Sequence, residues 1–157
     1  MSPIYSATTG KILLTSNSTK TLVLLNPVTN LFKIRQIDFS FDDATVASGV
    51  QMDIYRVNTL GTPTGLTATV QQFDARDTVP TTTALIATTT SGGISTEPSS
   101  VFVIASYLIQ PLGGLYSIPF PYGAEIIGQG AGSRIGVRYN NPANVSTDCI
   151  VNIAFEE

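Results

Sequence analysis

Three glycines at alternate positions, Gly128, Gly130 and Gly132, are the nearest approach in this sequence to a phosphate-binding loop. Such a loop needs glycines so that backbone N–H groups can approach the anion, and a helix that begins directly after it. Residues 134–139 (RIGVRY) instead alternate with the period of a half-buried strand. The spacing therefore favours the turn of a glycine-rich β-hairpin that joins Ile126-Ile127 to this strand.

Acidic residues are the next candidates, because paired carboxylates can hydrolyse glycosides and oxygen ligands can hold calcium. Asp42 and Asp43 are adjacent, beside small polar residues, and are typical of a turn. Asp38 and Asp53 lie in predicted strands on the polar face, where we expect solvent or a cross-strand arginine beside them. The arginine partners expected are Arg35 or Arg56 for these two aspartates, and Arg134 for Glu125 across the hairpin.

The nucleophiles in this chain lack a recognisable base. The chain contains no histidine, so Ser-His-Asp chemistry is excluded. Cys149 shares one face of a predicted strand with apolar residues, which favours a buried thiol over a catalytic one. A Ser–Lys or Thr nucleophile stays open, although no motif surrounds any lysine. We assign no catalytic, cofactor-binding or metal-binding residue, and we expect no enzyme activity.

The charge content is low for a chain of 157 residues. Charged residues make up 12% of the sequence, against about 25% in average soluble proteins. The eight basic residues are scattered, so we expect no nucleic-acid partner. The longest apolar run, Val101 to Ile109, is too short for a transmembrane helix, and no signal peptide is visible, which predicts cytoplasmic synthesis without a membrane partner. Weak surface charge is a hint of coverage by neighbouring subunits, although an ordinary threonine-rich β-protein fits equally well.

The hydrophobic pattern predicts an all-β fold throughout the chain. Short alternating segments separated by turns indicate an antiparallel β-sandwich of about eight to ten strands, jelly-roll-like in arrangement. An immunoglobulin-type sandwich is the rival, but the chain has no tryptophan and one cysteine. In Phe32 to Phe41 the apolar positions change parity, which predicts a β-bulge near Arg35-Gln36.

Three segments carry more specific expectations. Val101 to Ile109 is apolar at both parities, which predicts a central strand covered on both faces. Thr81 to Pro98 is rich in threonine, serine and glycine, which suggests a mobile surface loop in which 84–87 forms an edge strand or a helical turn. Residues 1–10 are predicted to be an extended N-terminal arm that reaches a neighbour, or a frayed terminus, and residues 11–157 to be a single β-sandwich domain.

Two stretches carry a resemblance to a known class of protein. They are 33–57, KIRQIDFSFDDATVASGVQMDIYRV, and 118–157, IPFPYGAEIIGQGAGSRIGVRYNNPANVSTDCIVNIAFEE. The order is a strand ending in Ser-Phe-Asp, a strand containing an apolar residue two positions before Ile-Tyr-Arg, a Pro-Tyr-Gly-x-Glu turn, a glycine-rich hairpin into Arg-Ile-Gly-Val-Arg, and a final Phe-Glu-Glu. Over about half of the chain this resembles the small all-β capsid decoration (cement) proteins of tailed bacteriophages.

The resemblance implies a structural protein made in the cytoplasm of a host bacterium. It would sit on the outer capsid surface of the virion as a homotrimer and bridge major capsid protein subunits. One alternative is a minor tail or tail-tip protein that binds a receptor glycan, with Tyr107, Tyr116, Tyr122 and Tyr139 as candidate sugar platforms. A second alternative is a jelly-roll hydrolase or lyase with two carboxylates in a cleft.

Overall fold

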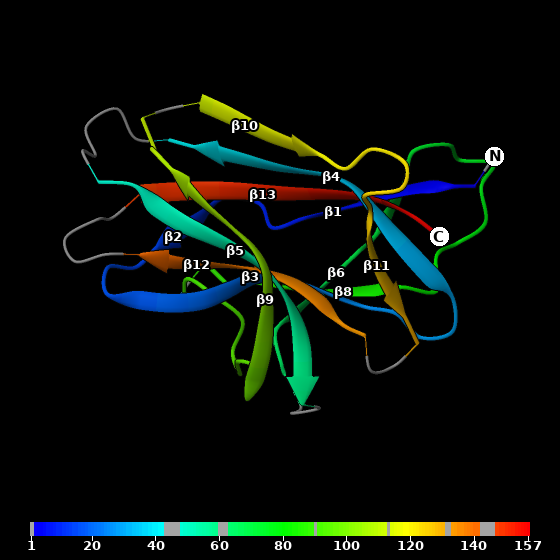
Figure 1. Ribbon diagram of the computed structural model, residues 1–157, viewed down its shortest axis with the longest axis horizontal. Coiled ribbons are helices and arrows are strands. Elements are labelled where there is room, and N and C mark those ends of the chain that lie inside the picture. The colour runs from blue at the N-terminus through cyan, green and yellow to red at the C-terminus, as the bar shows by residue number, and fades with distance from the viewer. Residues whose placement is uncertain are drawn as a thin grey trace.

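The computed structural model describes residues 2–42, 48–59, 63–89, 91–112, 114–130, 133–141 and 147–157. These residues contain thirteen strands and no helix, and the strands form two antiparallel sheets that face each other (Figure 1). The predicted antiparallel β-sandwich is therefore confirmed, with more strands than the eight to ten expected. In the ranges described, no helix has the length and apolar character that crossing a bilayer requires.

The first sheet has seven strands, whose bounds are β1 Ile4–Thr8, β2 Ile12–Leu14, β4 Leu31–Phe41, β7 Gln71–Gln72, β10 Gly114–Pro119, β11 Ile126–Gln129 and β13 Thr147–Glu156. Its order is β10-β4-β13-β1-β7, with β2 also paired to β13 and β11 also paired to β4. β10 pairs with the second half of β4 and β11 with its first half. These two strands therefore form one edge of the sheet, and the prolines around β10 suit an edge position, as expected.

The second sheet has six strands, whose bounds are β3 Ser18–Asn26, β5 Val50–Thr59, β6 Leu66–Ala68, β8 Thr83–Ile86, β9 Ser100–Ile109 and β12 Ile135–Asn141. Its order is β6-β8-β3-β12-β5-β9, so β9 is an edge strand. Within the two sheets, β1-β13-β4-β10 faces β3-β12-β5-β9, and strands from the two ends of the chain pair with each other. This is the strand order of a jelly roll, and the remaining short strands extend it.

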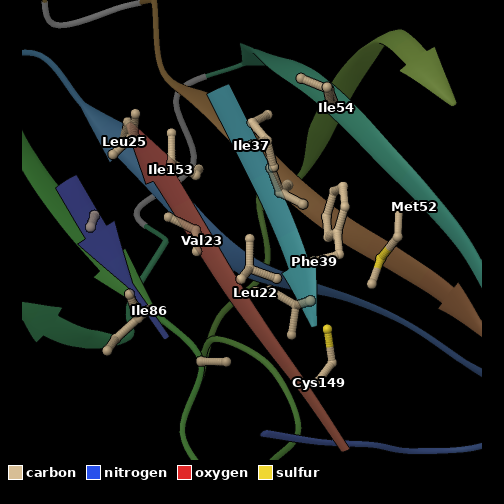
Figure 2. Packing of buried hydrophobic residues seen from close by; sticks show 14 of the residues in the cluster. Leu22, Val23, Leu25, Ile37, Phe39, Met52, Ile54, Ile86, Cys149 and Ile153 are labelled. Carbon is tan, nitrogen blue, oxygen red and sulfur yellow. The ribbon is translucent and has the colours of Figure 1, made fainter. Parts of the chain in front are cut away.

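The core lies between the sheets, where each strand turns its apolar parity inward. β13 shows the pattern most clearly, since Cys149, Val151, Ile153 and Phe155 are buried and alternate with partly exposed residues, as predicted. Figure 2 shows Ile37, Phe39, Cys149 and Ile153 of the first sheet among side chains of the second. Those labelled from the second sheet are Leu22, Val23, Leu25, Met52, Ile54 and Ile86.

The predicted β-bulge in β4 is present, and Arg35 is its extra residue. On the neighbouring strand β13, Ala154 pairs with Gln36, whereas the next residue, Phe155, pairs with Ile34. Apolar residues of β4 on both sides of the bulge are fully buried, so the bulge lets one strand keep its apolar face inward across a change of parity.

The glycine-rich segment is not a hairpin, and this prediction was wrong. β11 pairs with β4 in the first sheet, whereas β12 pairs with β3 and β5 in the second, so the segment crosses between the sheets. Period-two alternation identified the flanking strands but carries no information about their partners. Gly128 lies against the ring of Phe32, where a Cβ would collide, and Gly130 has a left-handed φ of 69°. Gly132 lies outside the described residues.

The structure also differs from the expectations for the N-terminus and for residues 81–98. Within residues 1–10, Ile4–Thr8 forms strand β1 between β13 and β7, so this part is a strand of the sheet and not an arm. β8 pairs with β3 on one side and β6 on the other, so it is not an edge strand. After β8, Ile94 N–H donates to Thr21 O at 3.0 Å and Glu97 Oε1 accepts from Thr21 N–H at 2.8 Å, which holds the segment on the sheet.

Candidate functional site

Asp38 and Asp53 occupy matching positions beside the two outer strands, β10 and β9. Each aspartate accepts hydrogen bonds from a glutamine two residues earlier and from a serine on the adjacent edge strand, and Gln36 Nε2 also lies 3.0 Å from Asp38 Oδ2. The bonds are Gln36 Nε2 to Asp38 Oδ1 (2.8 Å), Ser117 Oγ to Asp38 Oδ1 (2.6 Å), Gln51 Nε2 to Asp53 Oδ1 (2.7 Å) and Ser106 Oγ to Asp53 Oδ1 (2.6 Å). These carboxylates therefore fasten edge strands to the sheets behind them.

Asp53 has a charged partner as well, but not one of the arginines expected. Its cross-strand neighbour on β12 is Arg138, whose Nε donates to Asp53 Oδ2 at 3.1 Å. Arg56 instead donates to the carbonyl of Ile127 at 3.1 Å. Burial raises the pKa of Asp53, but the hydrogen bonds from the glutamine, the serine and Arg138 outweigh it and leave the pKa below its usual value. Asp53 is thus a buried anion with a structural role.

Glu125 pairs with Arg35 and not with Arg134, because β11 and β12 belong to different sheets. The bulge places the Arg35 guanidinium between Glu125 Oε1, 2.6 Å from Nη1, and Glu156, whose Oε2 accepts from Nε at 2.6 Å. The centroid of the Tyr122 ring lies 3.9 Å from Cζ, the central carbon of the Arg35 guanidinium. We call these four residues the Arg35 clasp. It joins the β10–β11 connection to the C-terminal strand.

The environment of the clasp lowers the pKa of both glutamates. For Glu125 the main cause is the hydrogen bond from its own backbone N–H, and Gly123 N–H and Arg35 add to it against the opposing effect of burial. For Glu156 burial raises the pKa, but hydrogen bonds from Ser2 and Arg35 outweigh it. Both carboxylates are therefore held in the ionised form around a single cation.

The remaining candidate nucleophiles and acids also have structural positions. Cys149 is 1% exposed, and burial raises the pKa of its thiol, which disfavours the reactive thiolate. Lys11 Nζ lies 2.5 Å from Asp42 and 3.1 Å from Asp148 on the surface. Asp43 lies outside the described residues. Within the described part of the chain, no three His, Cys, Asp or Glu side chains gather in a way that could hold a metal ion.

The four tyrosines considered as sugar platforms differ in exposure. Tyr139 is fully buried, and its hydroxyl lies 3.1 Å from Thr15 Oγ1, so it cannot stack on a ligand. Tyr107 is partly buried against the core. Tyr116 is 36% exposed and packs edge-on against Phe41, and Tyr122 is 86% exposed. Only these last two offer an accessible ring.

The edge strands β9 and β10 and the connection between them carry many exposed apolar residues. Val101 to Ile109 was expected to be central and covered, but it forms most of β9, which is an edge. A short connection leads from β9 into β10, and in Figure 1 the end of β9 lies near the start of β10. We call these two edge strands and the connection between them the flank. Its exposed apolar residues are Phe102, Val103, Ile104, Leu108, Leu112 and Leu115, with exposures from 38% to 75%.

A groove of about 560 Å³ opens on the flank between β9 and β11. Phe102 and Ile104 line it from one sheet, and Ile126 and Ile127 from the other. Arg56 and Glu125 also line it, and both are already bound, Arg56 to the Ile127 carbonyl and Glu125 to Arg35. The groove is therefore an apolar feature with its neighbouring charges neutralised or hydrogen-bonded.

The segment of the chain that forms the flank also contains no charged residue. From Pro98 to Ala124 the sequence contains no Asp, Glu, Lys, Arg or His. Monomeric proteins protect exposed edge strands with charged side chains or prolines, because a bare edge invites pairing with another chain. β9 contains neither. Sequence reasoning noted the apolar run but missed its exposure, and the absence of charge around it was the signal that could have indicated an interface.

Comparisons with known proteins add no further information on this surface. No protein-family model, curated protein or solved structure matched the chain.

Proposed function

We propose that this protein is a structural virion protein of a tailed bacteriophage. In this proposal it binds the outer capsid surface as a homotrimer and reinforces the contacts between major capsid protein subunits, without catalysis. The observation that carries the proposal is the flank: two sheet edges that expose apolar residues and are free of charge. Such a surface favours association with other protein surfaces.

The stretches that carry the resemblance to decoration proteins support the same assignment. Residues 33–57 span most of β4 and β5, and residues 118–157 supply β11, β12 and β13. The Pro-Tyr-Gly-x-Glu turn supplies Tyr122 and Glu125 to the Arg35 clasp. The motif residues therefore have identifiable roles in building the jelly roll, which is how a structural family without a catalytic site would retain a recognisable pattern.

A binding role of this kind depends on area and on copy number. A stable protein contact typically buries about 1,600 Å² in total, shared between the two partners. A trimer that touches several capsid subunits at once gains further affinity, because each later contact forms at high effective concentration. Reinforcement of a capsid therefore needs accessible surface on a rigid fold, and the two edges fastened by Asp38 and Asp53 fit that need.

The proposal is tested by locating the protein on its parent particle. Purified protein is added to shells that lack it, and the bound fraction is measured by co-sedimentation and electron microscopy. We expect saturable binding at micromolar concentration, density on the outer face of the capsid, and a higher temperature of shell disruption. Absence of binding, or labelling confined to the tail tip, would contradict the proposal. A tail-tip location would instead favour glycan binding through Tyr116 or Tyr122.

A further inference from the structure

We infer that a hollow beside the Arg35 clasp binds a neutral saccharide, with the ring of Tyr122 as its stacking platform. The hollow has a volume of about 570 Å³ and lies between the start of β1, the end of β13 and the β10–β11 connection (Figure 1). Its walls combine apolar side chains with a few polar ones, as ligand sites of this size do. The apolar lining includes Ile4, Phe120 and Tyr122, and the polar lining is Ser2, Arg35 and Glu156. This inference goes beyond the proposed function, because reinforcement of a capsid needs no such site.

Tyr122 is an exposed aromatic ring that the fold holds in place. It lies in a turn in which Pro121 O accepts from Ala124 N–H at 3.0 Å, and Gly123 has a left-handed φ of 89°, as at the third position of a type II turn. One face of the ring lies on the Arg35 guanidinium, which the two glutamates of the clasp fix in turn. The ring is nevertheless 86% exposed. Its orientation is therefore set before any ligand arrives, which lowers the entropy cost of stacking.

The charges around the hollow balance one another, which favours an uncharged ligand. Glu125 and Glu156 both bond to Arg35, and Lys33 on β4 is the cross-strand neighbour of Glu156. Two negative and two positive charges leave no net attraction for a phosphate or another anion. A cation gains little as well, because Arg35 already occupies one face of the Tyr122 ring.

The hydrogen-bonding groups of the hollow favour a ligand that carries hydroxyls. A carboxylate can accept about four hydrogen bonds. Glu156 accepts from Nε and Nη2 of Arg35 and from Ser2, so it has capacity for a further donor. The Ser2 hydroxyl at the rim can itself donate or accept.

A pyranose ring combines the features that the hollow requires. Its C–H face is flat and apolar and fits the open face of Tyr122, and its hydroxyls lie around the edge, where they can reach Glu156 and Ser2. A proline residue also offers a flat apolar face but has no N–H to donate. A base in a nucleic acid brings phosphates, for which the balanced charges offer no attraction.

The test is binding of the labelled protein to an array of neutral and acidic oligosaccharides that includes bacterial surface polysaccharides. The free saccharide with the strongest signal is then titrated by calorimetry. We expect binding to neutral saccharides, and a loss of affinity of about tenfold or more in Tyr122→Ala, because a stacked aromatic ring dominates such contacts. Tyr116→Ala is the matched control, since Tyr116 is 36% exposed on β10 and outside the hollow, and it should bind as the wild type does.

Two further variants separate stacking from a general loosening of the clasp. Tyr122→Phe keeps the ring and should retain most of the affinity. Tyr122→Leu keeps an apolar cover over Arg35 but lacks a flat face, so it should bind as weakly as Tyr122→Ala. All three variants should keep the circular dichroism of the wild type, because the side chain is largely exposed.

Three results would overturn the inference: no binding of the wild type to any neutral saccharide, equal affinity in Tyr122→Ala and the wild type, or binding confined to acidic saccharides. Co-sedimentation of Tyr122→Ala with shells that lack the protein is measured alongside. We expect the variant to bind shells as the wild type does. A failure of saccharide binding is therefore distinguishable from a failure of the proposed function.

Discussion

Gly136 in β12 lies so close to a side chain on the neighbouring strand that this position requires a glycine. Tyr55 pairs with it across β5 and β12, and the Tyr55 ring lies where a Cβ on residue 136 would stand. The Tyr55 hydroxyl lies 2.7 Å from Thr21 Oγ1 on β3, so the ring bridges three strands on the outer face of the second sheet. The glycine is needed for this close approach and not for a special backbone angle.

Substitution of Gly136 by alanine tests this contact. We expect Gly136→Ala to lower the free energy of unfolding by about 1–3 kcal/mol, because the methyl group overpacks against the ring. Gly114→Ala is the matched control, since a Cβ there would make only an ordinary contact with the Tyr116 ring at 4.0 Å, and it should be near neutral. Chemical denaturation monitored by fluorescence measures both. If the loss in Gly136→Ala persists in a Tyr55→Ala background, the ring is not its cause.

The Arg35 clasp predicts a dependence of stability on pH. Both glutamates have pKa values below normal in the folded protein, so their stabilising effect is complete above the unfolded pKa of about 4.3 and is lost as pH falls through the folded values. We therefore expect the melting temperature of the wild type to fall in acid through this range. Arg35→Gln should be less stable at pH 7 and should lose less on acidification.

Thermal melts of the wild type and Arg35→Gln between pH 7 and pH 3 measure this difference. Lys11→Gln serves as the control, because its ion pairs with Asp42 and Asp148 lie on the surface and contribute little. Parallel curves for the wild type and Arg35→Gln would contradict the assignment of the clasp as a source of acid sensitivity.

At the scale of elements, the edges of the sandwich are fastened by polar contacts from within the sheets. Asp53 and Asp38 play matching parts, but Asp53 is buried and paired with Arg138, whereas Asp38 is bonded to neutral donors nearer the surface. Removing a carboxylate from a buried pair leaves an uncompensated charge, which is more damaging than losing a surface hydrogen bond. The network behind β9 therefore includes a charged pair, whereas the network behind β10 consists of hydrogen bonds from neutral donors.

We expect Asp53→Asn to lower the free energy of unfolding by about 3 kcal/mol and to increase hydrogen exchange along β9. Asp38→Asn, the matched control on the other edge, should lose about 1 kcal/mol or less. Denaturation and exchange measured on both variants make the comparison. Equal losses in the two variants would show that Arg138 adds nothing to the attachment of β9.

The fold could be predicted from local pattern to a large extent, and the pairing of strands could not. Alternation along β13 and the change of parity at Arg35 are properties of a single strand, so the sequence reveals them directly. Whether β11 pairs with β12, or whether Val101 to Ile109 is central, depends on segments far away in the chain. The partners of Asp53 and Glu125 were missed for the same reason, because each depends on which strand lies alongside.

At the scale of the whole molecule, the jelly roll has two uncharged edges with exposed apolar residues. β9 and β10 carry exposed apolar residues without any charge, and the Arg35 clasp and the Asp53 network hold the surrounding strands in place. A rigid fold with exposed apolar edges can function by association alone. In the proposed function the flank is the surface that associates with other proteins of the virion.

Electron cryo-microscopy of shells decorated with the purified protein tests the central claim most directly. The account predicts three-lobed density on the outer capsid face at three-fold or quasi-three-fold positions, with the flank of each jelly roll covered by protein. Shells that remain bare at saturating protein, or single jelly rolls bound with the flank open to solvent, would contradict it.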